Sequence, residues 1–229
     1  MNTEPQSLRL EMDGSWECPD LGRMCLHIED IYNLRLVLQF MLEDVKEWQD
    51  ELRENPDFFF LRRKMARALR IGAYSPITEA IPLSTLLDPL QLRRLAAILG
   101  SSGPLRIRRI EYASPGFTDL TGVGQIVGHL KDFLVQLIEI CRPSSREQRQ
   151  LENRQREVDI RQREISNARE VVALAKDIGL SETEIQRMVL WMDDRQETFI
   201  QLINEGKLTG VRLIEHDDGD DHKSARKFR

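Results

Sequence analysis

The chain has 229 residues, of which 38 are acidic and 33 basic, giving a formal net charge of −5. This length allows one ordinary domain with an appendage or two small domains. Three cysteines are too few for a disulfide framework, and no run of about 18 uncharged apolar residues exists, which argues against a disulfide-rich secreted protein and an ordinary membrane span. The first ten residues do not resemble a signal peptide, so we expect a cytoplasmic protein.

The hydrophobic pattern predicts an α+β fold, with a small sheet packed with helices, followed by a long charged helix and a C-terminal helical region. We expect an α+β core over 1–141, a coiled-coil-like charged helix over 142–178, a C-terminal helix and short strand over 179–214, and a disordered tail over 215–229.

Two helices and one strand are predicted in the first third of the chain. Residues 7–12 alternate apolar and polar side chains and precede Asp13-Gly14, which predicts a strand and a turn. An apolar stripe over 24–52 predicts a helix, although alternation over 34–40 is also compatible with a strand. A basic helix over 57–71 follows, because Pro56 suits a first helical turn.

Two similar segments suggest an internal repeat over 70–100 and 109–140. Each contains a Ser-Pro pair, at Ser75 and Ser114, after a short β-like run. Because proline ends a strand, each segment is read as strand, turn and helix. The helices are expected over 88–99 and about 119–140. So few residues match that chance similarity remains an equal alternative.

The charged region from Ser144 to residue 178 carries a seven-residue apolar repeat. The positions three residues further on are arginine in the first two heptads and alanine in the last two, so only half of a coiled-coil seam is apolar there. This pattern predicts a helix that docks by a narrow stripe, either on its own domain or on a second copy. The candidate partner-binding residues are Leu151, Val158, Ile165 and Val172.

The last predicted elements are a helix over 182–204 and a strand over 208–214. Ser181 and Glu184 have the spacing of a capping box, which predicts where this helix begins.

The sequence offers no recognised catalytic, metal or cofactor motif. Cys18, Cys25 and His27 lack the close ligand pairs of structural zinc. Gly122 and Gly124 belong to a G-x-G-x-x-x-G run that is one residue too long for a dinucleotide fingerprint, so we expect close helix packing there instead. We therefore predict no metal, no cofactor and no enzymatic activity.

Charge is unevenly distributed along the chain. Residues 1–57 carry 14 acidic and 5 basic groups, a net of −9, and residues 58–110 carry 10 basic and 2 acidic groups, a net of +8. The two regions either face each other or leave a basic surface for an anionic partner. The candidate polyanion-binding residues are Arg62, Arg63, Lys64, Arg67 and Arg70.

Three functions follow from these patterns, in decreasing order of support. The first is a non-enzymatic protein-interaction or self-association module acting through the 144–178 helix. The second is a protein that binds nucleic acid or an anionic membrane surface through the basic helix 57–71. The third is an enzyme with a pocket that the sequence does not reveal, lined by residues such as His27 or His129.

Overall fold

The computed structural model describes residues 4–54, 82–99, 104–111, 113–141 and 170–214. The strands are β1 (Pro5–Met12), β2 (Arg106–Glu111), β3 (Gly116–Val123) and β4 (Leu208–Ile214). The labelled helices are α1 (Cys18–Glu54), α4 (Leu83–Leu86), α5 (Pro89–Leu99), α6 (Gly124–Cys141) and α8 (Glu182–Asn204), and residues 170–177 form a further helical segment.

The four strands form one antiparallel sheet in the order β2-β3-β1-β4. The chain reaches β2 from β1 through α1, α4 and α5, and it reaches β4 from β3 through α6, helix 170–177 and α8. This connectivity is the split βαβ, or ferredoxin-like, arrangement with additional helices in both crossovers. The predicted α+β class is therefore confirmed.

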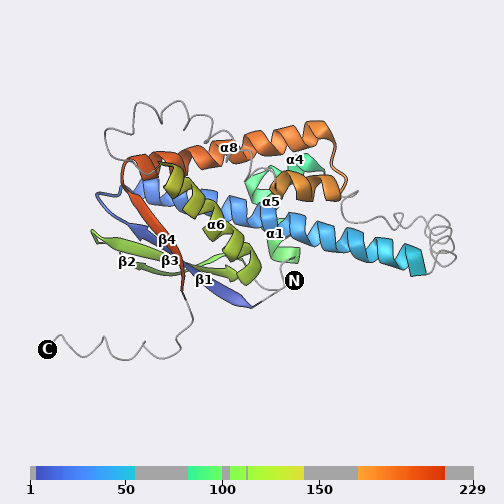
Figure 1. Cartoon of the computed structure of the whole chain (residues 1–229), viewed down its shortest axis with the longest axis horizontal. Helices are drawn as coiled ribbons and strands as arrows, with labels where there is room; N and C mark the ends of the chain where they lie inside the picture. Colours follow the sequence, from blue (N-terminus) through green and yellow to red (C-terminus); the bar gives the residue numbers. More distant parts are fainter. Residues whose placement is uncertain (1–3, 55–81, 100–103, 112, 142–169, 215–229) are drawn as a thin grey trace.

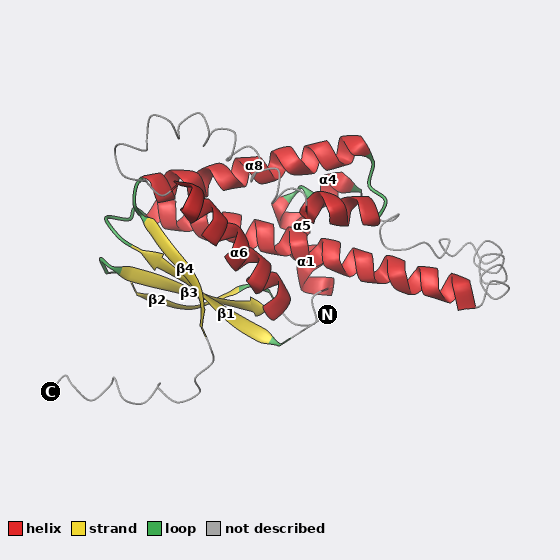
Figure 2. Cartoon of the chain, viewed as in Figure 1, coloured by secondary structure: helices red, strands yellow, loops and turns green. Residues whose placement is uncertain are grey.

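The helices lie on one side of the sheet (Figure 2). Leu8 and Leu10 of β1 are fully buried on that side, whereas Arg9 and Glu11 lie on the opposite face because successive side chains alternate in a strand. The predicted strand 7–12 is confirmed and begins two residues earlier.

Helix α1 runs past the sheet, and its C-terminal half projects beyond it (Figure 1). The expected helix 24–52 is confirmed, and the strand alternative over 34–40 is wrong. Leu34, Leu36, Val37 and Leu38 are all buried, because this stretch of α1 passes through the core. A helix that is buried on all sides carries apolar residues on all its faces, so no single apolar stripe is visible in its sequence. This explains why the sequence of residues 34–40 is also compatible with a strand.

The second Ser-Pro pair joins two strands and does not lead into a helix. Ser114-Pro115, a cis peptide, lies between β2 and β3, and α6 begins only at Gly124. The predicted helix 119–140 is therefore wrong over 119–123, which form the end of β3. The predicted helix 88–99 is confirmed as α5, while residues 70–81 of the first segment lie outside the described residues, so the duplication stays a prediction.

The C-terminal region completes the same sheet and core. The Ser181–Glu184 capping box is present at the start of α8, and the expected strand 208–214 is β4, which pairs with β1. Residues 179–214 thus belong structurally with the region predicted as the 1–141 core. Within the described part of the chain, no helix is both long and apolar enough to cross a bilayer.

Candidate functional site

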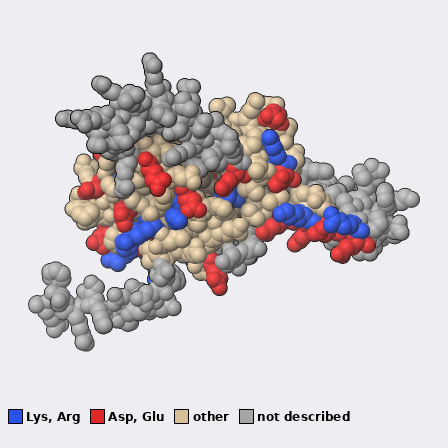
Figure 3. Space-filling model, in the orientation of Figure 1, with Lys and Arg blue, Asp and Glu red and all other residues tan. Residues whose placement is uncertain are grey.

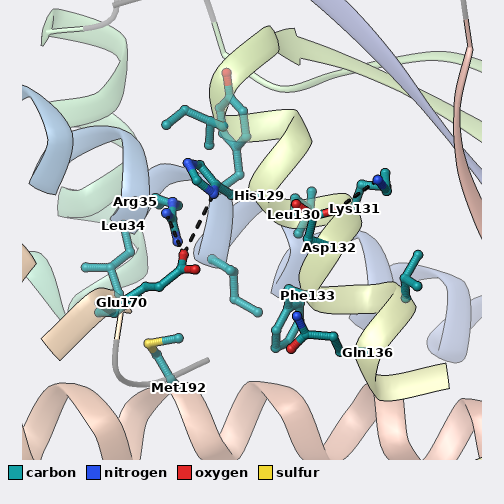
Figure 4. A pocket seen from close by; sticks show the side chains of 15 residues that line it. Leu34, Arg35, His129, Leu130, Lys131, Asp132, Phe133, Gln136, Glu170 and Met192 are labelled. Atoms are coloured by element: carbon teal, nitrogen blue, oxygen red, sulfur yellow. Dashed lines mark hydrogen bonds and ion pairs between the residues drawn. The ribbon is translucent and has the colours of Figure 1, made fainter. Parts of the chain in front are cut away.

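A cavity of about 250 Å³ lies where α1, α6, helix 170–177 and α8 meet (Figure 4). Its floor is apolar and buried: Leu34, Leu130, Val171 and Met192 are each less than 5% exposed. Polar and charged side chains, here called the rim, also line it: Arg35, His129, Lys131, Asp132, Gln136 and Glu170. The cavity is therefore amphipathic, with an apolar floor and a charged rim.

Three of the rim side chains form a cluster. The Arg35 guanidinium donates a hydrogen bond to Glu170 Oε2 at 2.9 Å, and His129 Nδ1 lies 3.7 Å from the same oxygen. The Arg35 side chain is only 16% exposed, whereas that of Glu170 is 62% exposed. Glu170 thus places a carboxylate between a largely buried cation and an imidazole.

The environment favours the neutral form of His129. Burial lowers its pKa from 6.5, and the neighbouring Arg35 lowers it further, while Glu170 and Asp132 act in the opposite direction. The imidazole of His129 is therefore mostly neutral at pH 7, and Arg35 is the permanent positive charge of this cluster.

A second candidate surface is the edge strand β2. All six residues of β2 are exposed, and β3 is its only partner among the described strands. Ile107 and Ile110 lie opposite Leu120 and Thr118, which are buried on the helix side of the sheet. The two isoleucines are nevertheless 51% and 43% exposed. Helix α6 packs on β3, β1 and β4, and α8 packs on β4. Ile107 and Ile110 of β2 therefore lie beyond the part of the sheet that α6 covers.

The open face of the sheet is occupied by ion pairs. Arg9 donates two hydrogen bonds to Asp119, at 2.7 and 2.8 Å, across β1 and β3. The guanidiniums of Arg9 and Arg109 lie 3.8 and 5.1 Å from the centre of the Phe117 ring. Because these cations already lie over the aromatic ring, it is not a free platform for stacking a nucleic-acid base.

A third cluster fastens α8 to α1 through a buried ion pair. Arg195 Nε lies 3.3 Å from Asp30 Oδ2, and the guanidinium lies 3.7 Å from the centre of the Trp191 ring. Burial raises the pKa of Asp30 and lowers that of His27 on the same helix. These groups are packed between helices, so we assign this cluster a structural role.

The cysteine and histidine residues considered for zinc are not brought together as a metal site. Cys18 is exposed at the start of α1, and Cys25 is half-buried. Over the described residues, no group of three or more potential metal ligands is present.

The predicted partner-binding and polyanion-binding residues are only partly placed. Val172 is half-buried and packs against the core of its own chain, next to the buried Val171 and Ala175. Leu151, Val158 and Ile165 lie outside the described residues, as do Arg62, Arg63, Lys64, Arg67 and Arg70.

Comparisons with known proteins identify no relative. No family model, curated protein or solved structure matches the chain.

Sequence reasoning missed both surfaces described above. Arg35 and Glu170 are 135 residues apart, and neither stands in a recognisable motif. The exposed apolar side chains of β2 depend on where the helices end over the sheet, which no local pattern reveals.

Proposed function

We propose that this protein is a non-enzymatic interaction module that binds an extended acidic segment of a partner protein along the edge of β2 that no described strand pairs with. The observation that carries the proposal is the exposure of all six residues of β2, including two isoleucines on the side of the sheet where the neighbouring strands are covered by helices. An added strand would complete the backbone hydrogen bonds of this edge.

Charge favours an acidic partner over a second copy at this edge. The strand contains three arginines and one glutamate, so pairing β2 with β2 of another molecule would bring like charges together. The register also shifts between Ile107 and Arg109, and such irregularities reduce edge-to-edge pairing of identical chains. An acidic strand would meet no such repulsion.

The geometry of β2 sets the pattern of the partner. Arg106 and Arg109 lie opposite Thr121 and Asp119 on the open face, whereas Ile107 and Ile110 lie on the helix side. The Arg109 guanidinium forms an ion pair with the Glu111 carboxylate at 3.1 Å, and both side chains are about half exposed or more. Exposed ion pairs of this kind contribute little to stability, so Arg109 can exchange Glu111 for an acidic residue of the partner. A segment that alternates acidic and apolar residues would match both faces.

The proposal is tested with a labelled peptide that alternates glutamate and valine, measured by fluorescence anisotropy. We expect saturable binding that weakens with salt and is lost when lysine replaces glutamate. The Ile107→Thr/Ile110→Thr variant should bind at least about tenfold more weakly, since two apolar contacts are lost. Ile98→Thr is the matched control, because Ile98 is 79% exposed on α5, away from the sheet.

Hydrogen exchange distinguishes strand addition from simple charge attraction. Added backbone hydrogen bonds should slow the exchange of β2 amides when the peptide binds. Peptide binding without this protection would contradict the proposal. Preferential binding of a single-stranded oligonucleotide, with a steep salt dependence, would instead support polyanion binding through the basic region.

Self-association through the 144–178 helix stays a separate part of the proposal. Val172 packs on its own chain, so the candidate contact residues that remain from the seven-residue pattern are Leu151, Val158 and Ile165. Replacing Val158 and Ile165 with glutamate should dissolve any oligomer seen by light scattering, and an unchanged mass would exclude this route. We further propose a cytoplasmic location, in keeping with three free cysteines.

A further inference from the structure

The cavity between α1, α6, helix 170–177 and α8 is a separate feature from the β2 edge. It combines an apolar floor with the Arg35–Glu170–His129 cluster at its rim (Figure 4). We propose that this cavity binds a small monocarboxylate with an apolar body, with the carboxylate on Arg35 in the place now taken by Glu170. This inference does not rest on the function proposed for β2.

The chain's own Glu170 indicates which group the cavity mouth recognises. Its carboxylate accepts a hydrogen bond from Arg35 at 2.9 Å and lies 3.7 Å from His129. Arg35 is largely buried and held on the core helix α1, so it is an ordered donor for a planar carboxylate. An arginine in this position favours a carboxylate over an amine or an uncharged group.

Glu170 is suited to displacement. Its side chain is 62% exposed, so it returns to water at little cost when another carboxylate takes its place. Arg35, in contrast, is largely buried and keeps an anionic partner in both states. The exchange therefore leaves Arg35 paired with one carboxylate, while Glu170 is hydrated.

The floor defines the body of the ligand. Leu34, Leu130, Val171 and Met192 are buried and offer only apolar contact. A volume of about 250 Å³ accommodates roughly eight water-sized groups at about 30 Å³ each. An aliphatic acid such as hexanoate, with a carboxylate and a short chain, matches both the size and the polarity.

The test is calorimetric titration of the full chain with hexanoate, hexanol and hexylamine. We expect saturable one-to-one binding of hexanoate and at least about tenfold weaker binding of the other two, since a charged hydrogen bond is lost. Equal binding of hexanol would show that only the apolar floor recognises ligands, and absence of hexanoate binding up to about 10 mM would overturn the proposal.

Two substitutions give opposite expectations and keep the test decisive. Arg35→Gln should weaken hexanoate binding by about tenfold or more. Glu170→Gln should strengthen it severalfold, because the competing carboxylate is removed. If Arg35→Gln fails to fold, as judged by circular dichroism, Glu170→Gln still decides the question.

The control for Glu170→Gln is Glu139→Gln, an exposed glutamate on α6 outside the cavity lining. It should leave hexanoate affinity unchanged. If Glu170→Gln lowers stability and does not strengthen hexanoate binding, the Arg35–Glu170 pair only fastens helix 170–177, and the inference fails.

Discussion

The hydroxyl of Tyr32 accepts a hydrogen bond from the backbone N–H of Val123 at 2.8 Å, joining the middle of α1 to the last residue of β3. Tyr32 is fully buried, and burial raises the pKa of its hydroxyl, so the hydroxyl stays protonated in the folded protein. The same ring lies against Gly122, the residue before Val123. This contact ties α1 to the end of β3, and Tyr32 also lines the cavity.

Replacing Gly122 with alanine should lower the free energy of unfolding by about 1–3 kcal/mol, because an added methyl group in a packed core forces neighbouring side chains and backbone to move. A β-carbon at Gly122 would lie 2.8 Å from the Tyr32 ring. Gly128, in the same glycine run but within α6, has no atom near an added β-carbon, so Gly128→Ala should stabilise by about 0.5–1 kcal/mol. Urea denaturation measures both, and equal effects would contradict the packing argument.

Removing Arg195 should destabilise the protein strongly, because Asp30 would remain buried without its counter-charge. The two side chains are 12% and 8% exposed, and breaking such a pair costs about 3–5 kcal/mol. We expect Arg195→Met to show this loss and Asp30→Asn/Arg195→Met to recover part of it. Arg187→Met, an exposed arginine on α8, is the control and should change the free energy of unfolding by less than about 0.5 kcal/mol.

Stability should fall as the pH drops below about 6.5. Burial lowers the pKa of both His27 and His129, so the unfolded chain binds protons in this range before the folded protein does. The charge of Arg195 also lowers the pKa of His27, while Asp30 and Asp194 raise it. In the same way, Arg35 lowers the pKa of His129, while Glu170 and Asp132 raise it. His129→Gln should shrink the difference in unfolding free energy between about pH 5.5 and 7.5.

The raised pKa of Asp30 acts with the opposite sign. Its folded form holds a proton more tightly than the unfolded chain, so this group loses stabilisation as the pH rises above 3.8. Because Asp30 is present in both proteins being compared, its contribution cancels when His129→Gln is measured against the natural sequence. An unchanged pH dependence in that variant would show that His129 titrates alike in both states.

Replacing Ser181 with alanine should cost about 0.5–2 kcal/mol, since α8 loses its capping box. The Ser181 hydroxyl accepts from the Glu184 N–H, while the Glu184 carboxylate accepts from the Ser181 N–H. Thr183→Ala, an exposed change in the same helical turn, is the control and should be nearly neutral. Thermal unfolding measures both variants.

The charged end of α1 shows why a local pattern can predict an element without predicting a partner. Acidic and basic side chains lie side by side along the projecting part of the helix (Figure 3). Arg53 lies 3.9 Å from Asp50 one turn away. Such interleaved charge stabilises an exposed helix and does not form a one-signed binding surface.

Local chemistry was sufficient where an element carries its own signal. The capping box at Ser181, the alternation in β1 and the apolar stripe of α1 each depend on residues close in sequence, and each predicted the correct element. The error over 119–123 arose because β3 runs directly into the apolar helix α6 with no turn residues between Val123 and Gly124, so no local signal separates the strand period from the helix period.

The sequence by itself determined the α+β class, most of the described helices and strands, and the absence of a familiar catalytic motif. Only the tertiary structure decided that β4 pairs with β1, that Arg35 meets Glu170, and that β2 is the exposed edge strand among the described strands. The physical reason is that periodicity and capping act over one or two turns of chain, whereas strand order and cavities depend on contacts between residues more than a hundred positions apart.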